Sequence, residues 1–198
     1  MTDIKHIQSY LDEKYPKNKG FFVFGSNVYK TNTIDSDIDL VVIDDQLSGS
    51  SVKAEYYDIQ FISLSDFITQ CQECDIKALE GLFGPFSLFK FETNTIKIDW
   101  NCLRSSISQK SSHSFVKAKK KFIDKEIKSG QKSLFHSLRI LEFGIQLAKN
   151  KKIEDFTGGG HYLRDILQYD SWEELNKTYK PIYNKLHSEF KMISPKAI

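Results

Sequence analysis

The sequence predicts an α+β protein, with a small β-sheet and flanking helices in the N-terminal half and a helical C-terminal half. The first observation is a set of short apolar runs, rich in aromatic and β-branched residues, that are typical of strands. These runs lie at residues 21–24, 37–43 and 54–62. The second observation is that apolar residues recur at the helical period after the serine-rich residues 105–114. We therefore expect two domains, residues 1–104 and residues 105–198.

The helices around the sheet follow from capping signals and apolar faces. A first helix is expected over residues 2–15, capped by Thr2 or Asp3, because apolar residues at positions 4, 7 and 11 share one face. Ser65 and Asp66 can cap a second helix, and Asp75 can begin a third. The pattern between residues 86 and 107 is ambiguous. Segments 88–91 and 95–98 could pair as a hairpin, and residues 99–107 could form a short helix. The later helices are expected at residues 114–127, 131–149, 161–169 and 171–192.

A glycine-serine pair and two aspartates surround the turn between the first two strands. Gly25 and Ser26 directly follow the first strand, and Ser26 is a good N-cap for a short helix whose amides would face an anion. Asp37 and Asp39 lie two residues apart at the start of the second strand, so their side chains project from one face. Asp35 is a weaker candidate that we interpret as a turn residue.

The third strand adds a further carboxylate to a polar face. Its period-two pattern places Tyr57, Ile59 and Phe61 on one side and Asp58 on the other. Neighbouring carboxylates repel each other unless a cation lies between them. A phosphate-binding turn beside such carboxylates is suited to metal-assisted chemistry on a nucleotide.

This pattern resembles the nucleotidyltransferase superfamily related to DNA polymerase β. Its signature is an apolar residue, then Gly-Ser or Gly-Gly, then a spacer of about ten residues, and then Asp-apolar-Asp/Glu-apolar. Phe24-Gly25-Ser26 and Asp37-Ile38-Asp39-Leu40 match it without a gap. The resemblance implies a small mixed β-sheet of the nucleotidyltransferase type. It also implies that Asp58, flanked by Tyr57 and Ile59, is the third carboxylate.

The resemblance further implies roles for these residues. Asp37, Asp39 and Asp58 would be the catalytic residues and would bind two Mg²⁺ ions, with Mn²⁺ as an alternative. Gly25 and Ser26 would bind the β- and γ-phosphates of an NTP such as ATP.

The middle of the chain is closest in pattern to one branch, the YcgL-type predicted nucleotidyltransferases of bacteria and phages. The resemblance covers about residues 20–150 and includes the segment Ala78-Leu79-Glu80 that ends at Pro85. A later helix in that branch carries a lysine, a histidine and an arginine. The corresponding residues here are Lys132, His136 and Arg139.

These three residues form a cationic row on the predicted helix 131–149. They lie at spacings of four and three, opposite the apolar face that contains Leu134 and Leu138. Because apolar residues also flank the row, we expect it to line the nucleotide-binding cleft, with the helical domain packed against the catalytic domain. The alternative is that the row pairs with structural acids such as Glu80 or Glu142.

Composition limits the kinds of partner and the cellular compartment that are expected for this protein. The net charge is only +2, so a preference for nucleic acid would depend on local patches such as the seven lysines between residues 117 and 132. That stretch is either a solvated helix face or a basic surface that attracts a triphosphate or a nucleic-acid acceptor. Three cysteines without a disulfide framework indicate a reducing, cytoplasmic compartment, and Cys71 and Cys74 are interpreted as ordinary helical residues. No apolar run is long enough for a membrane span.

The sequence therefore predicts a metal-dependent nucleotidyltransferase that moves an NMP from an NTP to an acceptor hydroxyl and releases pyrophosphate. The acceptor could be RNA, a protein side chain or a small molecule. The alternative is a non-catalytic nucleotide- or nucleic-acid-binding module on the same fold, which the presence of all three carboxylates disfavours. The pattern says nothing about oligomeric state.

Overall fold

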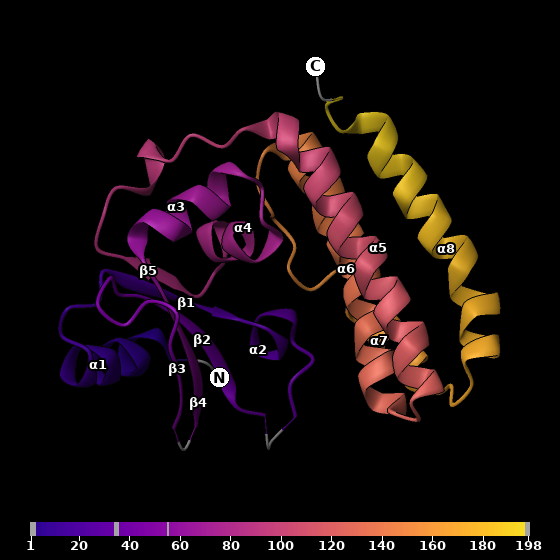
Figure 1. The fold of residues 1–198 in the computed structure, drawn as a ribbon, viewed down its shortest axis with the longest axis horizontal. Coiled ribbons are helices and arrows are strands. Elements are labelled where there is room, and N and C mark those ends of the chain that lie inside the picture. Colours follow the sequence, from indigo (N-terminus) through magenta and orange to yellow (C-terminus); the bar gives the residue numbers. More distant parts are fainter. Residues whose placement is uncertain (1–2, 34–35, 55, 197–198) are drawn as a thin grey trace. The chain divides into compact units, whose positions relative to one another are not determined.

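The computed structural model describes residues 3–33, 36–54 and 56–196, and its α+β organisation confirms the predicted fold class (Figure 1). The chain separates into two compact units, Met1–Asp99 and Trp100–Ile198. The first contains a five-stranded sheet with helices, and the second is helical. The predicted packing of the helical half against the sheet half remains a prediction.

The sheet of the first unit is mixed, as expected. Its strands are β1 (Gly20–Phe24), β2 (Ile38–Ile43), β3 (Ser51–Lys53), β4 (Tyr57–Ile62) and β5 (Ser87–Phe89). They are ordered β3-β4-β2-β1-β5, with β2 and β4 parallel and all other pairs antiparallel. The strand predicted over residues 54–62 is shorter in the structure, where it is β4. Residues 51–53 form a further strand, β3, which pairs with β4 as a hairpin.

Helices cover the two faces of the sheet. On one face lies α1 (Ile4–Lys14), after which the Tyr15 ring packs 4.9 Å from the ring of Phe61. On the other face lie α3 (Leu64–Gln72) and α4 (Ile76–Phe83), where Phe67 of α3 packs 5.8 Å from Phe22. Figure 1 shows α1 and the pair α3 and α4 on opposite sides of the strands. The predicted alternation along β4 therefore holds, since Phe61 faces α1.

The helix starts follow local capping chemistry. Asp3 and Asp75 cap α1 and α4 as expected, and the Asp75 carboxylate accepts a hydrogen bond of 2.9 Å from the Lys77 amide. The cap of α3 is Ser63, two residues before the predicted Ser65, because its hydroxyl accepts the Asp66 amide at 3.0 Å. Asp66 thus lies in the first turn of the helix, where a carboxylate is favourable.

The ambiguous segment after α4 does not form the hairpin. Instead β5 pairs with β1, and Thr93–Thr95 forms a 3₁₀ turn. A second 3₁₀ turn at Trp100–Cys102 leads directly into the first long helix of the next unit. The free edge of β1 is thus paired with β5, a strand that belongs to the segment whose secondary structure the sequence left ambiguous.

The second unit consists of α5 (Leu103–Ile123), α6 (Ile127–Asn150), α7 (Gly160–Ile166) and α8 (Trp172–Ile193). The predicted helix 114–127 was wrong at both ends, since α5 begins at Leu103 and stops at Ile123. Gly130 lies within α6, where an added Cβ would fall 2.4 Å from the Phe122 ring. Close packing therefore explains this glycine.

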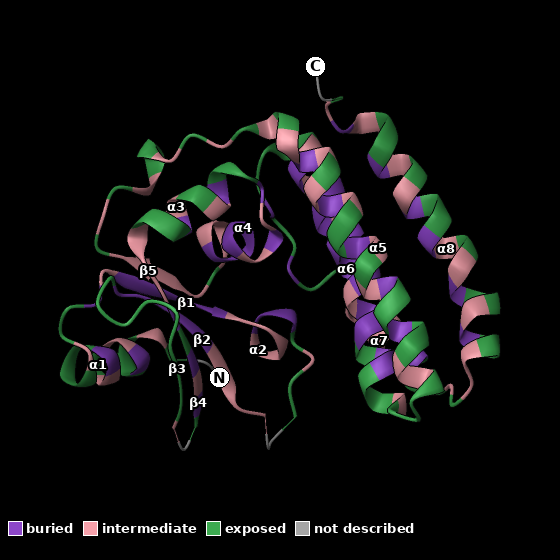
Figure 2. Ribbon diagram, viewed as in Figure 1, coloured by how far each residue is buried: buried purple, intermediate pink, exposed green. Residues whose placement is uncertain are grey.

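Three long helices of this unit pack on one another. Between α5 and α6, the buried Ser111 hydroxyl donates to the Ser137 carbonyl at 2.9 Å. Between α5 and α8, the rings of Phe115 and Tyr183 lie 4.6 Å apart. As Figure 2 shows, α6 has buried residues along most of its length, so it forms the core of the unit. Ser171 caps α8, with its hydroxyl accepting the Glu174 amide.

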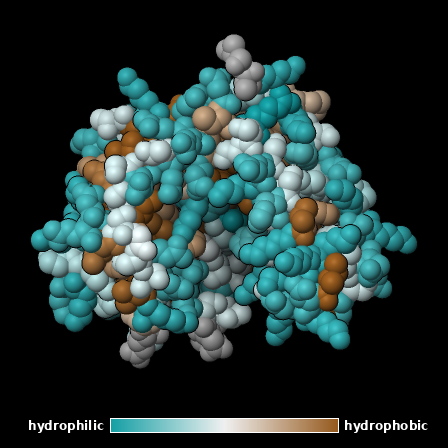
Figure 3. Space-filling model, viewed as in Figure 1, coloured by the Kyte–Doolittle hydropathy of each residue, from teal (hydrophilic) through white to brown (hydrophobic). Residues whose placement is uncertain are grey.

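The visible surface is mostly hydrophilic, with apolar residues in scattered positions (Figure 3). The most exposed large apolar side chains are those of Met192, Ile123, Val116 and Tyr56. Within the described residues, no helix combines the length and the apolar character that crossing a membrane requires.

Candidate nucleotidyl-transfer site

A row of side chains crosses four strands on the face of the sheet that α3 and α4 cover. Asp39 of β2 is the register partner of Phe24 in β1 and of Asp58 in β4. Asp58 is in turn the partner of Lys53 in β3. Because paired residues on neighbouring strands project from the same face, these four side chains form one line. The structure thus places Asp39 and Asp58 side by side, as the polar faces of two predicted strands suggested.

Asp37 joins this group from just before β2. Its carboxylate forms an ion pair of 3.0 Å with the Lys53 ammonium. The carboxylates of Asp37 and Asp58 together raise the pKa of Lys53, chiefly through the hydrogen bond to Asp37. Lys53 was not among the predicted site residues, because its place beside Asp58 depends on the β3–β4 hairpin.

Gly25 brings the backbone of the next turn against Asp39. Its φ of 75° and ψ of −152° lie in a region that side chains disfavour, and an added Cβ would fall 2.4 Å from Asp39 Oδ2. Only glycine allows this approach. The sequence pattern had predicted Ser26 as the N-cap, whereas the cap is Gly25 and Ser26 is the first residue of the short α2 (Ser26–Tyr29).

Two side-chain hydrogen bonds hold α2 in place. Asn27 Nδ2 donates to the Asp37 carbonyl at 3.1 Å, which ties α2 to the start of β2. The buried Tyr29 hydroxyl donates to the buried carboxylate of Glu80 in α4. Glu80 thus contacts the short helix that begins directly after Gly25.

The carboxylates have the donor chemistry that Mg²⁺ prefers, but they are not drawn together around one point. Among the residues that the structure describes, no three His, Cys, Asp or Glu side chains are arranged to hold a metal ion. Asp39 and Asp58 are nevertheless adjacent in register, and the close approach of Gly25 leaves room on the Asp39 carboxylate where a Cβ would otherwise lie. The residues therefore fit a divalent cation in the type of ligand they offer, and two of them are neighbours in register. Asp35 lies outside the described residues.

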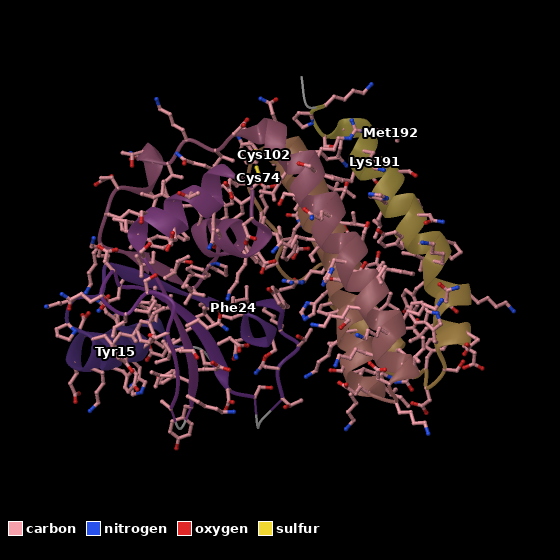
Figure 4. All side chains as sticks on the ribbon, in the orientation of Figure 1. Tyr15, Phe24, Cys74, Cys102, Lys191 and Met192 are labelled. Carbon is pink, nitrogen blue, oxygen red and sulfur yellow. The ribbon has the colours of Figure 1, made fainter. Side chains whose placement is uncertain are left out.

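A second lysine that the sequence did not single out lies at the Phe24 end of the row. The Lys77 ammonium of α4 is 3.9 Å from the centroid of the Phe24 ring, and Phe24 is labelled in Figure 4. It also donates to Gln60 Oε1 at 2.6 Å. The sequence held no signal for it, because a lysine in the first turn of a helix is unremarkable until the sheet beneath it is known.

Comparison with known families fits this geometry. The family model described as "Nucleotidyltransferase domain" matches residues 4–100. Residues 4–100 are thus a nucleotidyltransferase domain. The match includes Gly25, Ser26 and the three aspartates, and it ends where the first compact unit ends.

Among solved structures, the chain is similar to a nucleotidyltransferase-like protein from Exiguobacterium sibiricum. The two share 13% sequence identity with a TM-score of 0.35, over 96% of this chain and 73% of that protein. No curated protein matches the sequence.

The remaining predicted residues lie on α6, outside the nucleotidyltransferase domain. Lys132 is exposed, His136 is half-buried and Arg139 is buried. Arg139 Nη2 lies 3.3 Å from His136 Nδ1, which brings two of the three side chains together. Burial and the guanidinium of Arg139 lower the pKa of His136 to about 3, so this imidazole is neutral near pH 7. The row therefore has two cations, where the sequence suggested three.

The lysine-rich stretch of α5 and α6 is also separate from that domain. Most of its lysines are exposed, and Lys121 pairs with Glu126 at 2.7 Å. Exposed, hydrated lysines of this kind agree with the solvated helix face, one of the two interpretations of the stretch.

Proposed function

We propose that the protein is a metal-dependent nucleotidyltransferase that transfers an NMP from an NTP, such as ATP, to an acceptor hydroxyl. The observation that carries this proposal is the register that pairs Asp39 with Asp58, together with the approach of Gly25 to Asp39. A carboxylate pair beside a glycine turn gathers the groups for metal and phosphate binding in one place. The match of residues 4–100 to the nucleotidyltransferase domain supports the same reaction class.

Asp37, Asp39 and Asp58 would hold the divalent ions, two Mg²⁺ or Mn²⁺. When bound, these ions supply charge stabilisation at the phosphate being transferred. The backbone at Gly25 and Ser26 would bind the β- and γ-phosphates. Two hydrogen bonds, from Asn27 and Tyr29, would keep that backbone in place.

In the reaction, the acceptor oxygen attacks the α-phosphorus and the bond from that phosphorus to the pyrophosphate oxygen breaks. The proton of the acceptor hydroxyl passes to Asp58, whose carboxylate is half-buried and projects from the site face. The product is an NMP ester of the acceptor, and pyrophosphate is released. RNA, a protein side chain and a small molecule all offer a suitable hydroxyl.

Two further assignments belong to this proposal. Lys132 and Arg139 contribute to phosphate binding, with Arg139 able to act in bidentate fashion and His136 orienting it through their contact. The closer relationship to the YcgL-type branch rests on the sequence pattern of residues 20–150.

The test is incubation of the protein with labelled NTPs and Mg²⁺ or Mn²⁺, in the presence of RNA, protein and small-molecule acceptors. Mass spectrometry then identifies what is labelled. Transfer that Asp39→Asn reduces at least about 10³-fold, with an unchanged melting temperature, would support the proposal, because the variant removes a metal charge but not the packing of β2. Wild-type transfer by that variant would end it.

The alternative is a non-catalytic nucleotide-binding module on the same fold. It predicts saturable NTP binding with no labelled product for any acceptor or metal. The same experiment, with binding followed by calorimetry, separates the two functions.

A further inference from the structure

Lys77 is held in an unusual position for a lysine of a helix that packs on a sheet. It belongs to the first turn of α4 and is half-buried. Its ammonium lies over the face of the Phe24 ring at 3.9 Å, which is an attractive cation–π contact. The ammonium therefore lies over the sheet face from which Asp39 and Asp58 also project.

The packing of α4 fixes this position. Four residues further along α4, Gly81 lies against the ring of Phe22, where an added Cβ would come within 2.6 Å. Residues four apart share one face of a helix, and Phe22 and Phe24 share one face of β1. The contact of Gly81 with Phe22 thus sets α4 close to the sheet and aims Lys77 at Phe24.

Lys77 has hydrogen-bonding capacity that the protein does not use. An ammonium has three donors. Within the described part of the chain, the Lys77 ammonium makes one hydrogen bond, to the neutral Gln60 side chain, and no ion pair. Burial lowers the pKa of Lys77, while the carboxylates of Asp75 and Asp39 oppose that shift. A partly desolvated cation whose hydrogen-bond partner is neutral is further stabilised by direct contact with an incoming anion.

The surroundings favour a phosphate as that anion. Phe24, under the ammonium, is directly followed by Gly25 and Ser26, the residues proposed to bind the β- and γ-phosphates. Asp39, which would hold a metal ion, is the register partner of Phe24. A nucleotide triphosphate that bridges the metal ligands and the glycine turn therefore passes the Lys77 ammonium.

We propose that Lys77 is a further substrate-binding residue, whose ammonium binds a phosphate oxygen of the NTP. This inference rests on the proposed function for the identity of the ligand, and it adds a cation from within the nucleotidyltransferase domain itself. Gln60 and the Phe24 ring hold the ammonium in place before the nucleotide arrives.

The experiment measures binding of inorganic tripolyphosphate and of a non-hydrolysable ATP analogue to the full chain in Mg²⁺, by calorimetry. Lys77→Met keeps the aliphatic stem over Phe24 and removes the charge, so both ligands should bind at least about ten-fold more weakly. Lys77→Arg keeps a cation and should restore affinity to within about three-fold. The matched control is Lys97→Met, since Lys97 is an exposed lysine of the same unit.

A second measurement uses the unmodified protein, so it does not depend on the variants folding. Tripolyphosphate should slow acylation of Lys77 by an amine-reactive reagent and leave that of Lys97 unchanged, as read by mass spectrometry. Equal labelling of Lys77 with and without tripolyphosphate, or equal affinity of wild type and Lys77→Met, would overturn the role of Lys77. Lys77-dependent binding without any NMP transfer would instead refute only the proposed function.

Discussion

At the scale of single residues, Gly25 carries the most specific prediction. Gly25→Ala would force a Cβ against the Asp39 carboxylate and strain a backbone with φ of 75°. We expect it to lower the free energy of unfolding by roughly 1–3 kcal/mol and to remove NMP transfer, because Asp39 must move. Urea unfolding and the labelled-NTP assay measure the two effects.

Gly49 is a matched control for this change. It also has a positive φ, 84°, but an added Cβ would meet nothing within 4 Å. Gly49→Ala should therefore show only the backbone strain, about 1 kcal/mol, with transfer unchanged. If the two variants lose the same activity, the contact of Gly25 with Asp39 is not what matters.

The lowered pKa of His136 leads to a prediction of how the stability of the protein depends on pH. Its pKa is about 3 in the folded protein and near the ordinary 6.5 in the unfolded chain. Between these values the unfolded chain binds a proton that the folded protein does not, so stability falls as the pH falls below 6.5. His136→Gln should lose less stability than wild type between pH 7 and pH 5, as measured by urea unfolding at each pH.

The control for this change is His113→Gln, because His113 is exposed on α5. It should keep the wild-type dependence on pH. Equal slopes for wild type and His136→Gln would show that this imidazole does not couple to folding.

At the scale of elements, the link between α2 and α4 can be tested through one hydroxyl. Tyr29→Phe removes the donor to Glu80 and leaves a buried carboxylate with one hydrogen bond fewer. We expect a loss of about 1–3 kcal/mol in the free energy of unfolding and weaker NTP binding, because α2 begins at the phosphate-binding turn. Tyr10→Phe is the control, since within the described residues the Tyr10 hydroxyl makes no hydrogen bond to protein. Equal stability loss in both variants would argue against the α2–α4 link.

The elements also show what the sequence could and could not predict. Period-two alternation predicted correctly which side chains of β4 share the apolar face, because burial of one face of a strand requires an apolar residue at every second position. The separate strand β3, the pairing of β5 and the break after Ile123 were missed, since they depend on partners distant in sequence. Asp39 and Asp58 could be linked from strand polarity, whereas Lys53 and Lys77 required the sheet register.

At the scale of the whole molecule, a variant in the helical unit can test whether phosphate binding extends beyond the nucleotidyltransferase domain. Lys132 is exposed, so Lys132→Ala should leave the melting temperature unchanged and weaken NTP binding about three- to ten-fold through the loss of one charge. Calorimetry at low and high salt measures the effect, which should shrink as salt screens the charge.

Lys185→Ala is the control, because Lys185 is an exposed lysine on α8 of the same unit. It should bind NTP as wild type does. An equal loss of affinity in both variants would indicate a general field effect, and no loss in either would exclude Lys132 from phosphate binding.

The register of β2 with β4 also sets where the chain can tolerate a change of length during evolution. Most of the connection between Ile43 and Ser51 is exposed, so it can lengthen or shorten at small cost where the hydrogen bonds of Gly49 and Ser50 to Phe61 are kept. A single residue inserted between Asp58 and Ile59 would leave the buried Ile59 and Phe61 in register and turn the Asp58 carboxylate to the α1 side of the sheet. Natural insertions and deletions should therefore accumulate in the first segment and be absent from the second.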